Sequence, residues 1–101
     1  MPELKVKRLK TLKEKTIGLI GRENLAPIIF ETRFGIHTFG LKFPIDVLIL
    51  DSKKKVVVLK EVLSPNKIFL WNPVYKIVLE LPAGTIKKYN IRKGTKIQTS
   101  L

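Results

Sequence analysis

The chain has 101 residues, of which 45% are hydrophobic, and a formal net charge of +12 from 20 Lys and Arg against 8 Asp and Glu. This size fits one domain with a packed core and leaves no room for a second. Because there is no cysteine and only one histidine, disulfides, thiolate catalysis, zinc–thiolate sites and all-histidine metal sites are excluded. A mixed histidine–carboxylate site stays open, but we expect no metal or other cofactor.

The hydrophobic pattern predicts short strands separated by polar or proline-containing breaks. Apolar and basic residues alternate over residues 4–7, as in a half-buried strand. A short helix is expected within residues 14–24, where Thr16 is a suitable N-cap and Gly18 and Gly21 weaken the helix. Further strands are predicted at residues 26–32, 34–39, 45–50, 55–62, 75–81 and 96–100.

The strand at residues 45–50 is the clearest, because its almost wholly apolar and β-branched sequence is typical of a strand buried on both faces. The DSKK turn at residues 51–54 predicts a hairpin with residues 55–62. Residues 86–90 favour one helical turn. We therefore predict one domain over residues 1–101 that is mainly β (a β-rich α+β class), a compact small barrel or sandwich-like fold with one short helix.

Two segments carry the most specific information. GIHTFGLKFPIDVLILD (residues 35–51) places His37, Thr38 and Asp46 around an apolar Phe-Pro-Ile bend, and LELPAGT (residues 79–85) contains Glu80. Together they resemble the DUF192 family, whose typical pattern runs H-T-F-x-M-x-F-P-I-D-V-x-F-L-D, then L-E-L-P-A-G-T, then G-I-x-x-G-D. The resemblance covers residues 15–98. It implies a small single-domain protein from a family with no established activity.

The chain departs from this pattern at two positions. Leu41 stands where the family usually has methionine, which is a volume-conserving change. Thr95 stands where an aspartate usually follows the second glycine. The missing carboxylate argues against any chemistry at that corner.

His37, Asp46 and Glu80 are the candidate catalytic residues. If the bend at residues 41–45 folds back, His37 and Asp46 would lie close together in one concavity, and the carboxylate would orient the imidazole and raise its basicity. The pair could serve acid/base chemistry or ligand capture, or it could be a buried polar pair that only fixes the bend. Glu80 shares a face with Val78; such a residue is more often exposed, but it could be a third carboxylate in the same pocket.

Thr38, Phe43, Trp71 and Thr85 are candidate ligand-binding residues. The two threonine hydroxyls can donate to a ligand, although threonine is common in strands for structural reasons. Trp71 lies in a break; exposure would suggest recognition, but a plug of the core is the stronger interpretation.

The positive charge is concentrated at the two ends. Residues 1–22 and residues 81–101 each carry a net charge of +5, which leaves +2 for the middle. Residues 53–55 form a lysine run at the predicted hairpin tip, where such runs are usually solvated. The excess could be a nucleic-acid surface or the lysine-rich composition of a thermophile. The candidate nucleic-acid-binding residues are Lys5, Lys7, Arg8, Lys10, Lys87, Lys88, Arg92 and Lys96.

No apolar run approaches the roughly 20 residues that span a bilayer, and residues 1–15 lack the hydrophobic core of a signal peptide, so we expect a cytoplasmic protein. We expect it to bind a small ligand or peptide in a polar pocket beside HTFGLKFPID. Two alternatives stay open: non-specific binding of nucleic acid or an anionic surface through the basic ends, and hydrolase or lyase chemistry by His37 and Asp46.

Overall fold

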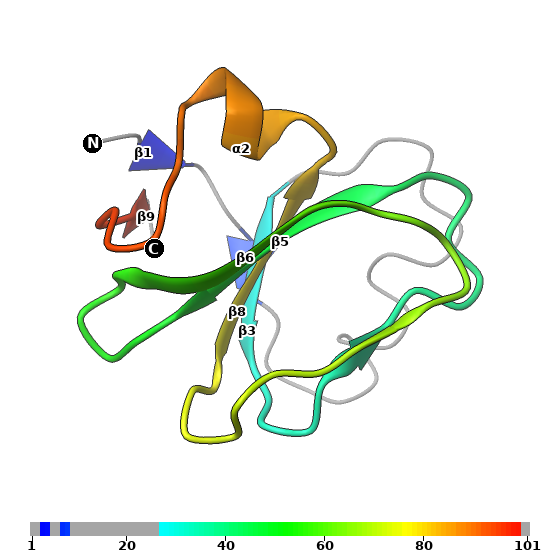
Figure 1. The fold of residues 1–101 in the computed structure, drawn as a ribbon, viewed down its shortest axis with the longest axis horizontal. Coiled ribbons are helices and arrows are strands. Elements are labelled where there is room, and N and C mark those ends of the chain that lie inside the picture. The colour runs from blue at the N-terminus through cyan, green and yellow to red at the C-terminus, as the bar shows by residue number, and fades with distance from the viewer. Residues whose placement is uncertain (1–2, 5–6, 9–26, 100–101) are drawn as a thin grey trace.

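The computed structural model describes residues 3–4, 7–8 and 27–99 (Figure 1). The helix expected within residues 14–24 lies outside this part of the chain. One short helix, α2, spans Thr85–Lys88 and confirms the predicted helical turn. The strands are β1 (Glu3–Leu4), β2 (Lys7–Arg8), β3 (Ile28–Glu31), β4 (Ile36–His37), β5 (Ile45–Leu50), β6 (Val56–Leu63), β7 (Ile68–Phe69), β8 (Ile77–Pro82) and β9 (Gln98–Thr99).

A five-stranded sheet in the order β2-β3-β8-β5-β6 forms the body of the domain. The neighbouring strands β3, β8, β5 and β6 pair antiparallel to one another, and β2 pairs with β3 in parallel at the other edge. The strands β4 and β7 form a separate antiparallel ribbon, and β1 pairs with β9 in parallel. The β-rich class with one short helix is therefore confirmed, and the described strands form no closed barrel. Within the same residues no helix is long and apolar enough to cross a membrane.

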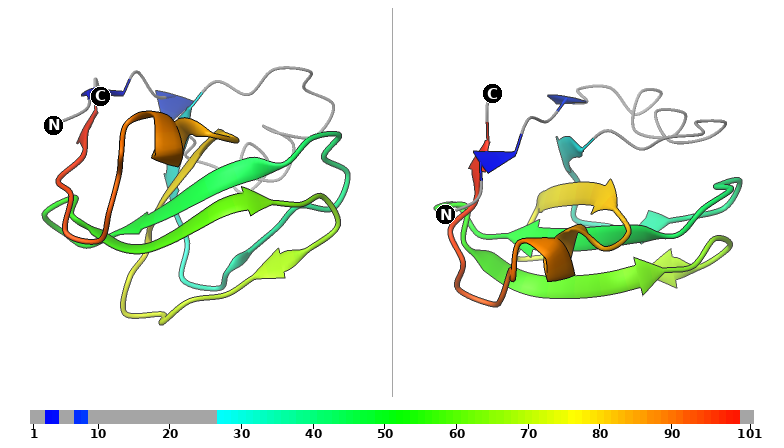
Figure 2. Two further views of the ribbon diagram at one scale, coloured as in Figure 1. Left: turned by 45° about the horizontal axis from the view of Figure 1, so that its top comes forward. Right: turned by 90° about the horizontal axis from the view of Figure 1, so that it is seen from above.

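The sheet is buried on both faces because alternate residues of β5 enter two different cores. Leu48 and Leu50 pack with Ile86 of α2, on what we call the helix face. Val47 and Ile49 pack on the opposite side against the core that the β4–β7 ribbon covers, which we call the ribbon face. Figure 2 shows α2 beside the sheet and the ribbon beyond its end. All six residues of β5 are buried, as the apolar run predicted.

The predicted hairpin of β5 and β6 is confirmed, but a bulge interrupts its ladder. Ile45 pairs with Leu63, whereas Val47 pairs with Lys60, so β6 contains one extra residue opposite Asp46. Val62 lies in this bulge with φ 51. Positive φ is a genuine outlier for a β-branched side chain, so a specific interaction must hold the bulge in place.

The strand predicted at residues 34–39 is reduced to two residues, and its partner was not predicted. Gly35 and Gly40 both have φ 85 and end the extended backbone on either side of β4. β4 pairs with β7, which lies in a segment that the sequence indicated as a loop. A two-residue strand is too short to show alternation, so only its contact with β4 reveals it.

Replacing Val62 with asparagine should stabilise the protein by about 0.5–1 kcal/mol, because asparagine tolerates positive φ and little packing is lost from a residue that is 54% exposed. Urea unfolding measures the change. Val74→Asn is the matched control, since Val74 is 68% exposed and is not among the residues with positive φ. A gain of equal size in both variants would show that the bulge is unstrained.

Candidate functional site

Asp46 is fully buried, and its carboxylate accepts hydrogen bonds from three backbone N–H groups. Oδ1 accepts from Val62 at 2.9 Å, and Oδ2 accepts from Gly84 at 3.1 Å and from Ile86 at 2.9 Å. The alternation of β5 directs Asp46 toward the helix face, where the chain enters α2. One side chain therefore joins the bulge of β6 to the start of α2.

The turn into α2 depends on this carboxylate. Gly84 is the N-cap residue with φ 94, and it offers no side chain that could accept from the first N–H groups of the helix. Asp46 supplies the missing acceptor from another strand. The hydroxyl of Thr85 donates to the carbonyl of Pro82 at 2.6 Å and closes the same turn.

Thr38 has a comparable role beside β4. Its side chain is buried, and Oγ1 donates to the carbonyl of Ser64 at 2.7 Å and accepts from the N–H of Lys67 at 2.8 Å. The backbone of Thr38 also bonds to Lys67 and Asn66. Thr38 thus fixes the turn between β6 and β7, at the same end of β6 that Asp46 holds.

His37 and Asp46 do not form the expected pair. His37 is exposed, its Nδ1 accepts from the N–H of Phe39 at 3.3 Å, and its ring stacks on that of Phe39 with 5.1 Å between centroids. Its neighbour Ile36 packs on the ribbon face, whereas Asp46 bonds on the helix face. Among the described residues, no hydrogen bond joins the two side chains, so the interpretation that each satisfies the other is wrong.

Glu80 is buried, which corrects the expectation that it is exposed. It pairs with Ile28 and Val47, both in the ribbon-face core, and is 2% exposed. Desolvation raises its pKa from 4.5 to about 8, and its Oε2 has no hydrogen-bond partner in the part of the chain that the structure describes. Asp46 pairs with Leu81 and points to the other side of the sheet, so the two carboxyl groups share no pocket.

The four ligand-binding candidates all have structural contacts. Phe43 and Trp71 are half-buried against the ribbon-face core, and the indole N–H of Trp71 donates to the carbonyl of Tyr75 at 2.7 Å. The hydroxyls of Thr38 and Thr85 donate to backbone carbonyls, as described above. A contact of these residues with a ligand remains a prediction. Among the described residues, no group of three or more His, Asp or Glu side chains could hold a metal ion.

Two concavities flank β6, one on each face. The ribbon-side groove has a volume of about 330 Å³, and its lining includes Lys60, Val62, Lys67, Ile68 and Phe69. The helix-side groove has a volume of about 370 Å³, and its lining includes Leu59, Glu61, Ile86, Lys87 and Arg92. Sequence reasoning missed both grooves, because their walls come from segments far apart in the chain.

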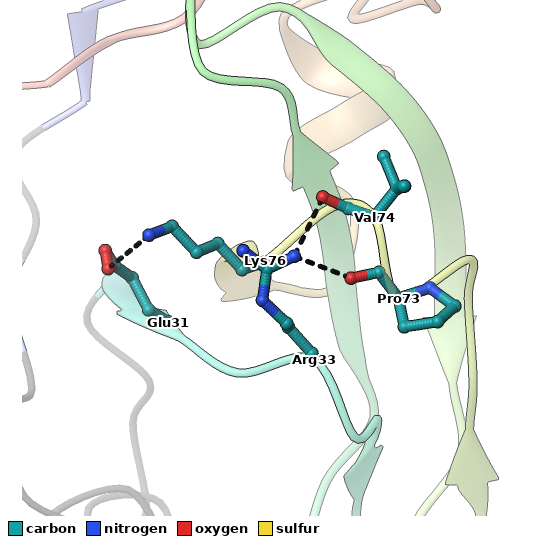
Figure 3. Close-up of polar contacts among 5 residues, drawn as sticks. All are labelled: Glu31, Arg33, Pro73, Val74 and Lys76. Carbon is teal, nitrogen blue, oxygen red and sulfur yellow. Dashed lines mark hydrogen bonds and ion pairs between the residues drawn. The ribbon is translucent and has the colours of Figure 1, made fainter.

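A third concavity, of about 280 Å³, lies beside the turn before β8. Its lining residue Arg33 donates through Nη1 to the carbonyls of Pro73 at 2.8 Å and Val74 at 3.1 Å (Figure 3). The Lys76 ammonium lies 3.8 Å from the Glu31 carboxylate. Both cations are therefore engaged with the protein, and this region supports the turn.

Comparisons with known proteins agree with this fold. The DUF192 family, described as uncharacterized ACR, matches residues 2–99. A UPF0127 protein of Pyrococcus abyssi is 39% identical over 71 residues, which are 68% of this chain and only 60% of that relative.

Two crystal structures are similar in fold at low sequence identity. A putative transcription regulator from Sinorhizobium meliloti 1021 is 21% identical with a TM-score of 0.73, over 88% of this chain and 76% of the other. A protein of unknown function from Novosphingobium aromaticivorans DSM 12444 is 20% identical with a TM-score of 0.76, over 90% and 70% of the two chains.

Asp46→Asn should lower the free energy of unfolding by about 2–4 kcal/mol, measured in urea, because three N–H groups bond to both carboxylate oxygens and an amide offers only one oxygen. Asp51→Asn is the matched control. Asp51 accepts from the N–H groups of Lys53 and Lys55 through Oδ1 alone, so an amide oxygen can replace it. Similar losses in the two variants would contradict the role assigned to Asp46.

Glu80→Gln should remove a pH dependence of stability. Since the pKa of Glu80 is raised to about 8 in the folded state, its contribution is fully present below pH 4.5 and is lost as the pH rises from 4.5 to 8. The two proteins should therefore unfold alike near pH 4.5, and the variant should be more stable by up to about 1.4 kcal/mol per pH unit above that. Urea unfolding at pH 4.5, 6 and 8 tests this, and parallel profiles would refute it.

Proposed function

The chain belongs to the DUF192 family, whose description assigns no activity, and from its edge strand we propose that it binds an extended peptide segment along β6. The supporting observation is that residues of this strand line grooves on both faces of the sheet. Lys60 and Val62 line the ribbon-side groove, and Leu59 and Glu61 line the helix-side groove.

Among the described residues, the outer edge of β6 is unpaired over most of its length. β6 is the last strand in the order of the five-stranded sheet. At its first residue, Val56 donates to the carbonyl of Thr95 at 2.9 Å and accepts from the N–H of Gly94 at 2.8 Å. In the described chain no strand pairs with the free edge beyond this point. Unpaired backbone donors and acceptors at an edge are a template for an added strand.

Side chains of an added strand would point alternately to the two faces of the sheet. With a groove on each face of β6, successive peptide side chains would enter the ribbon-side groove and the helix-side groove in turn. Backbone hydrogen bonds would supply affinity, and the two grooves would supply specificity, as in other cases of strand addition.

The charges of the grooves favour a peptide with acidic and apolar residues. Lys60 and Lys67 line the ribbon-side groove beside apolar surface from Ile68. In the helix-side groove, Lys87 and Arg92 outnumber the one acidic residue, Glu61. The lysine and the bulge at the edge of β6 disfavour pairing with a second copy of the chain. The grooves therefore suit an acidic, partly apolar segment of a different protein.

Two residues of the HTFGLKFPID motif, Asp46 and Thr38, hold the backbone around this site. Asp46 holds the backbone of Val62 in one groove and of Ile86 in the other, and Thr38 holds Ser64 and Lys67. These contacts support the expectation of a binding place beside HTFGLKFPID. In this proposal, Asp46 and Thr38 act by holding the backbone that surrounds the binding place.

A ten-residue peptide that alternates glutamate with valine or leucine tests the proposal, with a lysine-for-glutamate peptide as the ligand control. Titration into isotope-labelled protein should shift the amide resonances of residues 58–63 and of both groove walls. Lys60→Glu should weaken binding about five- to tenfold, since it reverses a charge at the groove. Lys42→Glu is the matched variant, because Lys42 is exposed and lines neither groove.

Methylation of peptide nitrogens separates strand addition from simple groove binding. Only every second N–H of an added strand bonds to the edge. Methylation of one alternate set should therefore abolish binding, whereas methylation of the other set should leave it intact. Equal effects of the two sets, or amide shifts confined to regions away from β6, would overturn the proposal.

A further inference from the structure

The tip of the β5–β6 hairpin lies beside the C-terminal turn, although some forty residues separate them in the sequence. The N–H of Ile97 donates to the carbonyl of Lys54 at 2.9 Å, and two further backbone bonds join Val56 to Gly94 and Thr95. Lys55 and Lys96 form an isolated antiparallel bridge. Figures 1 and 2 show the two segments side by side.

This arrangement gathers six cationic residues, which we call the hairpin patch. Five of them are exposed and Lys54 is half-buried. The patch consists of Lys53, Lys54, Lys55, Arg92, Lys93 and Lys96.

Little negative charge opposes the patch. Residues 52–60 and 81–101 contain no Asp or Glu. Asp51 lies at the base of the tip, where its carboxylate accepts from the N–H groups of Lys53 and Lys55. The hydrogen bond from Lys55 is the main cause that lowers the pKa of Asp51, so the carboxylate serves the turn and remains charged. Within residues 52–60 and 81–101, therefore, no side-chain carboxylate offsets the positive charges of the patch.

The backbone beneath the patch is well fixed. Thr95 donates its N–H to the carbonyl of Arg92 at 3.0 Å, and its hydroxyl accepts from the N–H of Arg92 at 3.0 Å. Like charges directly opposite each other, as at Lys55 and Lys96, destabilise a strand pair. A bound polyanion would relieve that repulsion.

We propose that the hairpin patch binds the phosphate backbone of duplex nucleic acid. A duplex carries one negative charge per about 1.7 Å of its axis, so two adjacent cationic turns can contact successive phosphates. No residue of the patch is aromatic, which disfavours stacking on single-stranded bases. Lysine-rich contacts to phosphate position a duplex without reading its sequence. The patch shares Arg92 with the helix-side groove, and its other five residues line neither groove beside β6.

The patch differs from the surface expected from the sequence. Arg92 and Lys96 belong to both surfaces. Lys87 is not part of the patch, and it lines the helix-side groove together with Arg92. The lysines at residues 53–55, which the sequence indicated as a solvated tip, join the C-terminal turn. The pairing of β1 with β9 does bring the two ends of the chain together. The side chains of Lys5, Lys7, Arg8 and Lys10 lie outside the described residues, and their contribution stays a prediction.

Fluorescence anisotropy with a labelled duplex of about 20 base pairs, at about 50 and 200 mM salt, tests the proposal. The variant Lys53→Gln/Lys93→Gln/Lys96→Gln removes three patch charges. The control Lys42→Gln/Lys60→Gln/Lys67→Gln removes the same net charge from exposed lysines elsewhere. We expect the patch variant to lose at least about tenfold in affinity at low salt, with a salt slope shallower by roughly 2–3, and the control to lose less than about threefold.

Three outcomes would overturn the proposal. Equal losses in both variants would show that net charge alone attracts the duplex. If the unaltered protein does not bind the duplex at about 50 mM salt, the patch is solvated surface charge without a binding role. If a single strand of the same length binds more tightly than the duplex, the assignment of a duplex as the ligand is wrong. Because Lys60 and Lys67 line the ribbon-side groove, the peptide titration repeated on both variants separates failure of this proposal from failure of peptide binding.

Discussion

The hydrogen bonds of the buried Asp46 carboxylate connect β5, the bulge of β6 and the start of α2. A charged group without solvent needs several hydrogen-bond donors, and here three backbone N–H groups from two distant segments provide them. This requirement holds Val62 in a conformation that valine rarely adopts and anchors the start of a four-residue helix. Asp46 thus bonds to the backbone of one lining residue of each groove beside β6, Val62 and Ile86.

The strands were largely predictable, because burial imposes alternation or an apolar run that the sequence displays. β5, β6 and β8 lie close to their predicted positions, and the bend at residues 41–45 was recognised. The polar site was not predictable in the same way. A buried carboxylate can be satisfied by an imidazole or by backbone N–H groups, and the latter are invisible in the sequence because every residue except proline carries one.

Glu80 shows a second limit of sequence reasoning. Its neighbours in β8 have the alternation of a strand, and period two correctly places it on the face of Val78. Whether that face is exposed to solvent depends on what packs against it. In this fold it is part of a core that includes Ile28 and Val47. With its pKa raised to about 8, the side chain is mostly protonated near neutral pH. Burying an uncharged carboxylic acid in such a core costs much less free energy than burying a carboxylate.

The two proposed surfaces lie toward opposite ends of β6. At Val56 the edge of β6 is hydrogen-bonded to Gly94 and Thr95. The same contact places the C-terminal cations beside the hairpin tip. Toward Leu63 no described strand pairs with the edge. The bulge that Asp46 holds lies in this part of β6, between the two grooves. The contact that builds the hairpin patch therefore also sets where an added strand must end. In the two proposals, an acidic peptide would add to the unpaired part of the β6 edge, and a duplex would lie on the charged turn at the other end of the strand.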